Sequence, residues 1–273
     1  MLHRIRHVLV TEGFRSLFLK GTTFLVKNFR LKLESSIFYR LRWYTQLVLW
    51  WNTGRGRYSA VADPLSEIYV DPNDIRRVTG RGPFPGRFVR QDIGKIRAGD
   101  WDRNMDLFTD IGRVKAIQER IREESAWKEI EFVTDEISRI ESGHSETEWE
   151  TISDLRDWCD TVDDLQDSVN KSGYLSKKRV DEIAGDEPPG RSKTPIPLRD
   201  VKLNVTVDIG RDGDLLFVNG RHRLAVAQAL EVEQIPVNVV VRHREWQQKR
   251  EDVHASRGSS ECSFHPDLRD IVM

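Results

Sequence analysis

The sequence predicts a fold of the α+β class, because helical and strand patterns occupy different stretches of the chain. Residues 111–142 carry apolar side chains at helical spacing. Residues 201–209 instead alternate apolar and polar side chains, as a half-buried strand does. An Ala-rich stretch at about 221–231 reads as a helix between two apolar strands. A chain of 273 residues is long enough for one large domain, or for one domain with a sizeable insertion.

The first 57 residues form a basic, aromatic-rich arm. They hold eleven Lys or Arg residues and two acidic ones, whereas the rest of the chain has a net charge of -10. Helical spacing over residues 1–52, with basic and aromatic side chains interspersed, is typical of an interfacial helix. The alternative is a helical hairpin that packs on the body or on a second copy, so a homo-oligomer stays open. The charge predicts an anionic partner, either a membrane surface or a nucleic acid.

Composition and cysteine usage narrow the class of protein. The two cysteines, Cys159 and Cys262, leave one disulfide open, but no spacing indicates a structural zinc site. The N-terminus lacks the order of a secretory signal, and the longest strongly apolar run is shorter than the ~20 residues that span a bilayer. We therefore expect a cytoplasmic protein, with peripheral membrane contact left open.

The remaining elements follow from turn residues and short apolar runs. Residues 66–70 read as a strand that ends at Asp71-Pro72, and Asn73-Asp74 starts a short helix. Gly210 to Gly213 is predicted to turn a hairpin between the strands 201–209 and 215–218. Pro236 places the strand 235–241 at an edge or places Pro236 near a strand's beginning. We also expect loops over 79–90 and 184–200, a helix over 146–172, and a helix end at Gly143.

The turn Asn219-Gly220-Arg221-His222-Arg223 gathers groups that suit a phosphate. It lies between a predicted strand and a predicted helix, whose N-terminus presents unpaired N–H groups and the positive end of the macrodipole. Gly220 lets an anion approach the backbone, and the two arginines add forked donors. His222 can donate a hydrogen bond or move a proton. The alternative is structural: Arg223 pairs with a buried acid and His222 caps the helix.

The same stretch, through the Ile235-Pro236-Val237 strand, resembles the ParB/sulfiredoxin superfamily. The resemblance is strong over 214–242 and extends to 66–75 and 160–243. It implies a small mixed sheet with helices at 58–250, a large helical insertion at about 80–150, an added arm at 1–57 and a C-terminal tail at 251–273. The layout is also similar to that of ParB-like archaeal proteins.

Members of this superfamily bind nucleotide phosphates at this turn. Sulfiredoxins use ATP, partitioning proteins use CTP, and some relatives phosphorylate serine with ADP or ATP. The resemblance implies that Asn219, Gly220, Arg221, His222 and Arg223 hold the phosphates of such a nucleotide. Two positions depart from the pattern: Asn219 stands where kinase-type members carry Asp, and Arg221 stands where sulfiredoxins carry their reactive cysteine. Sulfinate repair is therefore not expected, and a serine-kinase mechanism loses its usual acid.

Two pairs of carboxylates are further candidates. Asp71 and Asp74 occupy the region where kinase relatives place a catalytic carboxylate, so they join His222 as candidate catalytic residues. Asp100 and Asp102 flank an aromatic residue in a loop, where two acids at this spacing can hold Mg²⁺ beside bound phosphates. The alternative for this turn is a helix cap beside a packed Trp101.

These observations lead to three hypotheses. The first is a ParB-like protein that binds ATP, ADP or CTP and transfers or hydrolyses a phosphoryl group, as a kinase or an NTPase. The second is a ParB-like nucleic-acid-binding module, of a kind also described as nuclease, although the body is acidic and no reading helix is recognisable. The third is a non-catalytic adaptor at the membrane periphery.

Overall fold

The computed structural model describes residues 42–54, 56–81, 92–143, 149–175, 204–256 and 264–272. The chain divides into two units, Met1–Val48 and Leu49–Met273, and the second holds the sheet. The predicted helix over residues 1–52 lies outside the described residues, except for α2 (Arg42–Asn52). The predicted loop over 184–200 also lies outside them. None of the described helices is long and apolar enough to cross a membrane.

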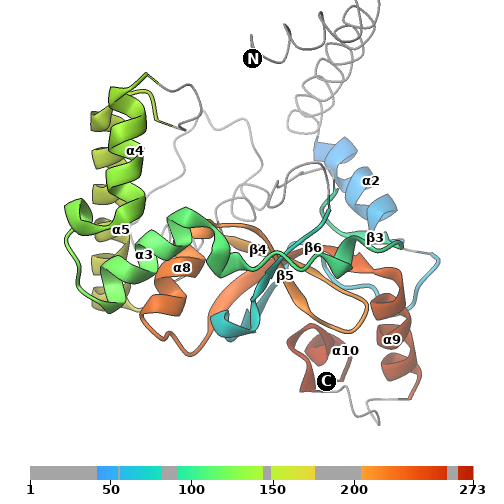
Figure 1. The fold of residues 1–273 in the computed structure, drawn as a ribbon. Coiled ribbons are helices and arrows are strands. Elements are labelled where there is room, and N and C mark those ends of the chain that lie inside the picture. The colour runs from blue at the N-terminus through green and yellow to red at the C-terminus, as the bar shows by residue number, and fades with distance from the viewer. Residues whose placement is uncertain are drawn as a thin grey trace, which may run out of the picture. The chain divides into compact units, whose positions relative to one another are not determined.

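The fold is of the α+β class, as predicted, and is built on a six-stranded mixed sheet (Figure 1). Five strands follow the order β1-β6-β4-β5-β2, and β3 pairs with β6. The β1–β6 and β4–β5 pairs are antiparallel, whereas β2–β5, β3–β6 and β4–β6 are parallel. The bounds are β1 Glu67–Val70, β2 Arg77–Val78, β3 Lys95–Arg97, β4 Val205–Ile209, β5 Leu215–Asn219 and β6 Ile235–His243.

The central strand β4 is buried on both faces, so the prediction of a half-buried strand is wrong for its described part. Thr206 and Asp208, the polar members of the alternation, are both fully buried. The Asp208 carboxylate accepts hydrogen bonds from the Nε of Arg81 at 2.8 Å and from the Oγ1 of Thr79 at 2.7 Å. The polar side chains at every second position of β4 therefore face the protein interior and not water, a distinction that periodicity cannot make.

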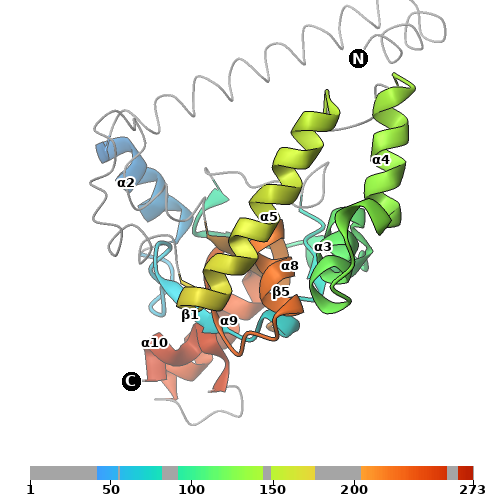
Figure 2. The same ribbon diagram turned by 90° about the vertical axis from the view of Figure 1, so that its left-hand side faces the viewer.

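Helices α3 and α5 pack on α8, and α4 packs on α3 and α5, apart from α9 and α10 (Figure 1). Figure 2 shows α4 rising from the end of α3 and α5 rising beside α8. Their bounds are α3 Gly112–Arg122, α4 Glu131–Glu141, α5 Ile152–Ser172, α8 Arg221–Ala229, α9 Arg244–Ala255 and α10 Arg269–Val272. Helix α5 begins with a capping box between Thr151 and Asp154, since each side chain bonds the backbone N–H of the other.

The stretch 111–142, whose spacing predicts helix throughout, forms two separate helices, α3 and α4. The chain leaves α3 at Glu124, whose φ of 54° is left-handed, and a short turn at Trp127–Glu129 precedes α4. The predicted helical insertion at 80–150 also contains β3, which pairs with the C-terminal half of β6. This segment is therefore partly integral to the sheet, because the pairing partner lies far away in sequence and leaves no local signal.

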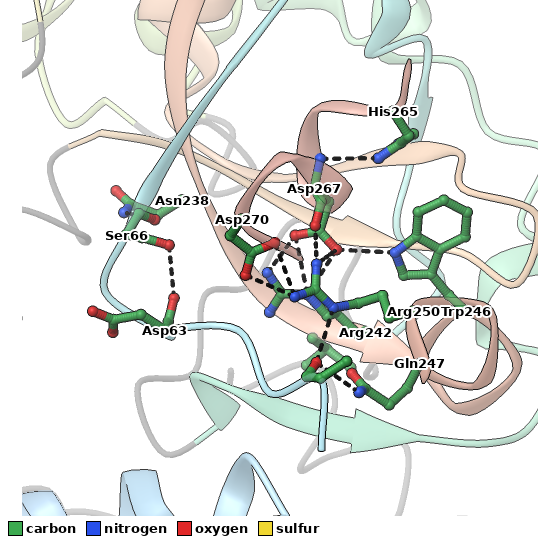
Figure 3. Close-up of polar contacts among 12 residues, drawn as sticks. Asp63, Ser66, Asn238, Arg242, Trp246, Gln247, Arg250, His265, Asp267 and Asp270 are labelled. Carbon is green, nitrogen blue, oxygen red and sulfur yellow. Dashed lines mark hydrogen bonds and ion pairs between the residues drawn. The ribbon is translucent and has the colours of Figure 1, made fainter. Parts of the chain in front are cut away.

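The described C-terminal residues pack into the body and do not form a separate tail. The carboxylate of Asp267 is buried and accepts hydrogen bonds from the Nε of Arg242 at 3.0 Å and the Nε1 of Trp246 at 2.9 Å (Figure 3). Arg250, which is fully buried, pairs with Asp267 at 3.2 Å and with Asp270 at 2.8 Å. This network ties α10 and the turn before it to β6 and α9.

Candidate functional site

The predicted order of strand, turn and helix is confirmed at Asn219 to Arg223. Asn219 is the last residue of β5, and Gly220 is the N-cap residue of α8 with a left-handed φ of 93°. A Cβ at this position would stand 2.8 Å from the Cα of Val205 in β4. Glycine is thus required twice, by its conformation and by the close approach of the β4 backbone.

His222 packs against α5 through a specific hydrogen bond. The Nε1 of Trp158 lies 3.0 Å from the Nε2 of His222, and the two rings meet edge to face. Because an indole N–H can only donate, Nε2 must accept, and the ring is neutral with its proton on Nδ1. His222 therefore does not offer Nε2 as a base in this arrangement, and its contact is closer to the structural interpretation than to a catalytic one.

Arg223 is also engaged within the protein. Its Nη2 donates to the backbone carbonyl of Leu175, and its guanidinium lies 4.9 Å from the ring centroid of Tyr174. Burial raises the pKa of the Tyr174 hydroxyl to about 12, although the neighbouring Arg223 charge acts to lower it. Arg223 thus fastens the chain after α5 to the first turn of α8.

Arg221 differs from its neighbours because it faces a cavity. This cavity has a volume of about 210 Å³ and lies between α3, α4 and the start of α8. The Nε of Arg221 is buried and has no hydrogen-bond partner among the described residues. Arg113 lines the same cavity and stacks on Trp149, with its guanidinium carbon 4.0 Å from the ring centroid. Two guanidinium groups, those of Arg113 and Arg221, therefore line the same cavity at the predicted turn.

Glu136 brings a carboxylate to the same cavity. It is only 5% exposed, and its Oε1 accepts a hydrogen bond from Arg139 at 2.7 Å. Its Oε2 is buried and has no hydrogen-bond partner among the described residues. Arg113, Glu136 and Trp149 are not among the site residues predicted from the sequence. A signal existed for Glu136, which lies three residues after the buried Val133 and so on the apolar face of α4.

Asp71 and Asp74 do not lie at the turn. The Oδ1 of Asp71 accepts from the N–H of Asn73 at 2.8 Å and caps the short helix Pro72–Asp74. The Nε2 of Gln228 donates to the carbonyl of Pro72 at 2.9 Å, which places this segment beside the other end of α8. Seven residues of helix correspond to about 10 Å, so these carboxylates are separated from the first turn of α8.

The carboxylates of Asp100 and Asp102 bind the guanidinium of Arg211, so they do not form an open metal site. The Nη2 of Arg211 lies 2.8 Å from Asp100 and 2.7 Å from Asp102. Burial acts to raise the pKa of Asp102, but hydrogen bonds from Arg211 lower it well below its usual range. Arg211 belongs to the β4–β5 turn, at the opposite end of β5 from Gly220. This pair does not fit a magnesium ion while Arg211 binds it.

Across the described residues, no group of three or more His, Cys, Asp or Glu side chains is arranged to hold a metal. Magnesium that arrives with a nucleotide therefore stays a prediction. The likeness to the ParB/sulfiredoxin superfamily stays one too. In comparisons with known proteins, the chain matches no family model, no curated protein and no solved structure.

Proposed function

We propose that this protein binds the phosphate groups of a nucleotide in the cavity lined by Arg221. One observation carries the proposal: the buried Nε of Arg221, in the first residue of α8, has no hydrogen-bond partner in the described structure. An unsatisfied buried donor costs roughly 1–3 kcal/mol, and more when it is charged, so a ligand that accepts from it is favoured. A phosphate oxygen is such an acceptor, and arginine binds phosphate with a planar fork.

The surroundings of Arg221 support an anion. Arg113 adds a second guanidinium, and Arg221 is the first residue of α8, where the helix dipole adds positive potential. The volume of about 210 Å³ is below the ~300–1,000 Å³ of sites that enclose a whole small molecule. The cavity therefore suits the phosphate end of a nucleotide, with the sugar and base outside it.

Glu136 sets a further requirement on the ligand. A second negative charge beside its carboxylate is unfavourable unless the ligand also presents a hydrogen-bond donor to the free Oε2. A hydroxyl group or a water molecule meets this requirement. Glu136 would accept its proton as its oxygen attacks the terminal phosphorus atom of the nucleotide, while the bond from that phosphorus to the bridging oxygen breaks and the shortened nucleotide leaves. We therefore assign to Glu136, and not to Asp71 or Asp74, the base of a phosphotransferase or NTPase. The arginines would neutralise charge and position the phosphates.

The test is binding of ATP, ADP, CTP and pyrophosphate, with and without Mg²⁺, measured by thermal shift and calorimetry. We expect a raised melting temperature with at least one of these ligands. Arg221→Gln should weaken that binding 10- to 100-fold, the range that a charge-assisted hydrogen bond of ~1.5–3 kcal/mol supports. Arg76→Gln is the matched control, since Arg76 is exposed and does not line the cavity.

Arg223→Ala is a poorer test, because Arg223 bonds Leu175 and its loss would change the fold and the binding together. Glu136→Gln should keep nucleotide affinity within a few-fold and abolish phosphate release or transfer. The proposal is refuted if no nucleotide shifts the melting temperature, or if Arg221→Gln binds as tightly as the unaltered protein.

A further inference from the structure

A second, basic pocket lies apart from the nucleotide cavity and shares no residue with it. It has a volume of about 250 Å³, and its lining includes Trp51, Arg57, Tyr58, Lys95 and Arg244. These residues come from the C-terminal end of α2 and the turn after it, from β3, and from the first residue of α9. Three distant segments of the sequence thus bring three cationic side chains to one place, and no carboxylate is among the described residues that line it.

Two of the three cations are not neutralised by the protein. Arg57 and Arg244 are exposed, and neither has an ion-pair partner among the described residues. The Nζ of Lys95 lies 2.6 Å from the Oδ1 of Asp92, so the charge of Lys95 is partly neutralised by that carboxylate. Arg244 also lies at the N-terminus of α9, whose dipole adds positive potential there. The pocket therefore attracts an anion.

Beside these cations, α2 exposes tryptophan. Trp50 is 47% and Trp51 69% exposed, whereas Trp149, Trp158 and Trp246 are all buried. Adjacent exposed indoles are uncommon on a surface that only meets water, because each leaves a large apolar area uncovered. Tryptophan is enriched where apolar and polar media meet, since its ring is apolar and its N–H is polar.

We infer that this face of the protein binds the surface of an anionic membrane, with a lipid phosphate in the basic pocket and Trp50 and Trp51 among the acyl chains. A compact pocket of about 250 Å³ suits one headgroup. Single-stranded nucleic acid needs a basic groove that follows several nucleotides, which this pocket does not provide. The inference is independent of nucleotide binding, because the two cavities have no residue in common.

The experiment is vesicle flotation of the full chain at 150 mM salt, with neutral phosphatidylcholine vesicles and with vesicles that contain 30% phosphatidylserine. We expect the full chain to float with the anionic vesicles only. In the double variant Arg57→Ala/Arg244→Ala, affinity for them should fall about 25-fold, since each basic residue near an anionic surface contributes about fivefold. Lys128→Ala is the matched control, because Lys128 is an exposed cation on another element. The affinity of this variant for the anionic vesicles should stay near that of the unaltered chain.

Trp51→Ala tests the apolar contribution with the charges kept, and it should also weaken flotation. Melting temperatures of all variants should be unchanged, because the substituted side chains are exposed. A double variant that floats like the unaltered chain overturns the inference. So does a double variant that loses affinity for a single-stranded oligonucleotide while it keeps its affinity for the anionic vesicles.

Discussion

Replacing Asp267 by Asn should remove the centre of the buried ionic network in Figure 3. The carboxylate of Asp267 receives both Arg242 and Arg250, and Asp267 and Arg250 are 2% exposed or less. Breaking one side of a buried ion pair costs about 3–5 kcal/mol, because the remaining charge stays buried without its counter-ion. Arg242 is the group left in this state, since Arg250 keeps Asp270. We expect the free energy of unfolding to fall by that amount.

The pH dependence of unfolding gives a second estimate of how much the Asp267 carboxylate contributes to the free energy of unfolding. Burial acts to raise the pKa of the Asp267 carboxyl, but the charges of Arg242 and Arg250 lower it from 3.8 to about 2. A carboxyl whose pKa is lowered by folding stabilises the protein above its unfolded pKa, and that stabilisation is lost as the pH falls towards the folded value. The fall to about 2 corresponds to roughly 2–3 kcal/mol of stabilisation near neutral pH, of which roughly half is lost by pH 3.

The assay is urea unfolding followed by tryptophan fluorescence at several pH values between 7 and 3. Asp212→Asn is the matched control, because Asp212 is exposed and meets Lys249 only at 3.4 Å, an ion pair worth at most about 1 kcal/mol. The difference between Asp267→Asn and the unaltered protein should shrink by about 1 kcal/mol from pH 7 to pH 3. A loss no larger than that of Asp212→Asn, or a difference that does not change with pH, would refute the reasoning.

Two further outcomes follow from local geometry. Gly220→Ala should lower the free energy of unfolding by more than Gly143→Ala in urea unfolding: both have a positive φ, worth ~1–2 kcal/mol, but only at Gly220 would the new Cβ meet another strand. Equal losses would contradict the proposed close approach to β4. In a Cys262→Ala background, the remaining Cys159 thiol should react with a disulfide reagent only as fast as the chain opens, since burial raises its pKa to about 12 and thiolate is the reactive form. If Cys159 reacted as fast as a free thiol at neutral pH, its thiol would be accessible in the folded protein, and this prediction would be wrong.

Much of the local structure was predictable from the sequence. The strand 66–70, the hairpin at Gly210 to Gly213, the helix after Gly220 and the strand 235–241 all occur near their expected bounds. Each depends on neighbours a few residues apart, through period-two alternation, turn chemistry or capping. The sequence also identified the turn at Gly220 for the same reason, because glycine before an Ala-rich helix is a local pattern.

The roles of the site residues needed the tertiary structure. Arg221 and Arg223 are the same residue type, two positions apart in one turn. In the structure Arg221 lines a cavity, whereas Arg223 donates a hydrogen bond to the carbonyl of Leu175, 48 residues away. Asp102 has an ordinary spacing for a metal ligand, but Arg211, 109 residues later, takes both its oxygens. Glu136 is a candidate only because the fold brings its side chain and Arg221 to the same cavity. Charged groups act over a few ångströms of space whatever their separation along the chain, so sequence determined which groups are present and the fold decided which of them meet.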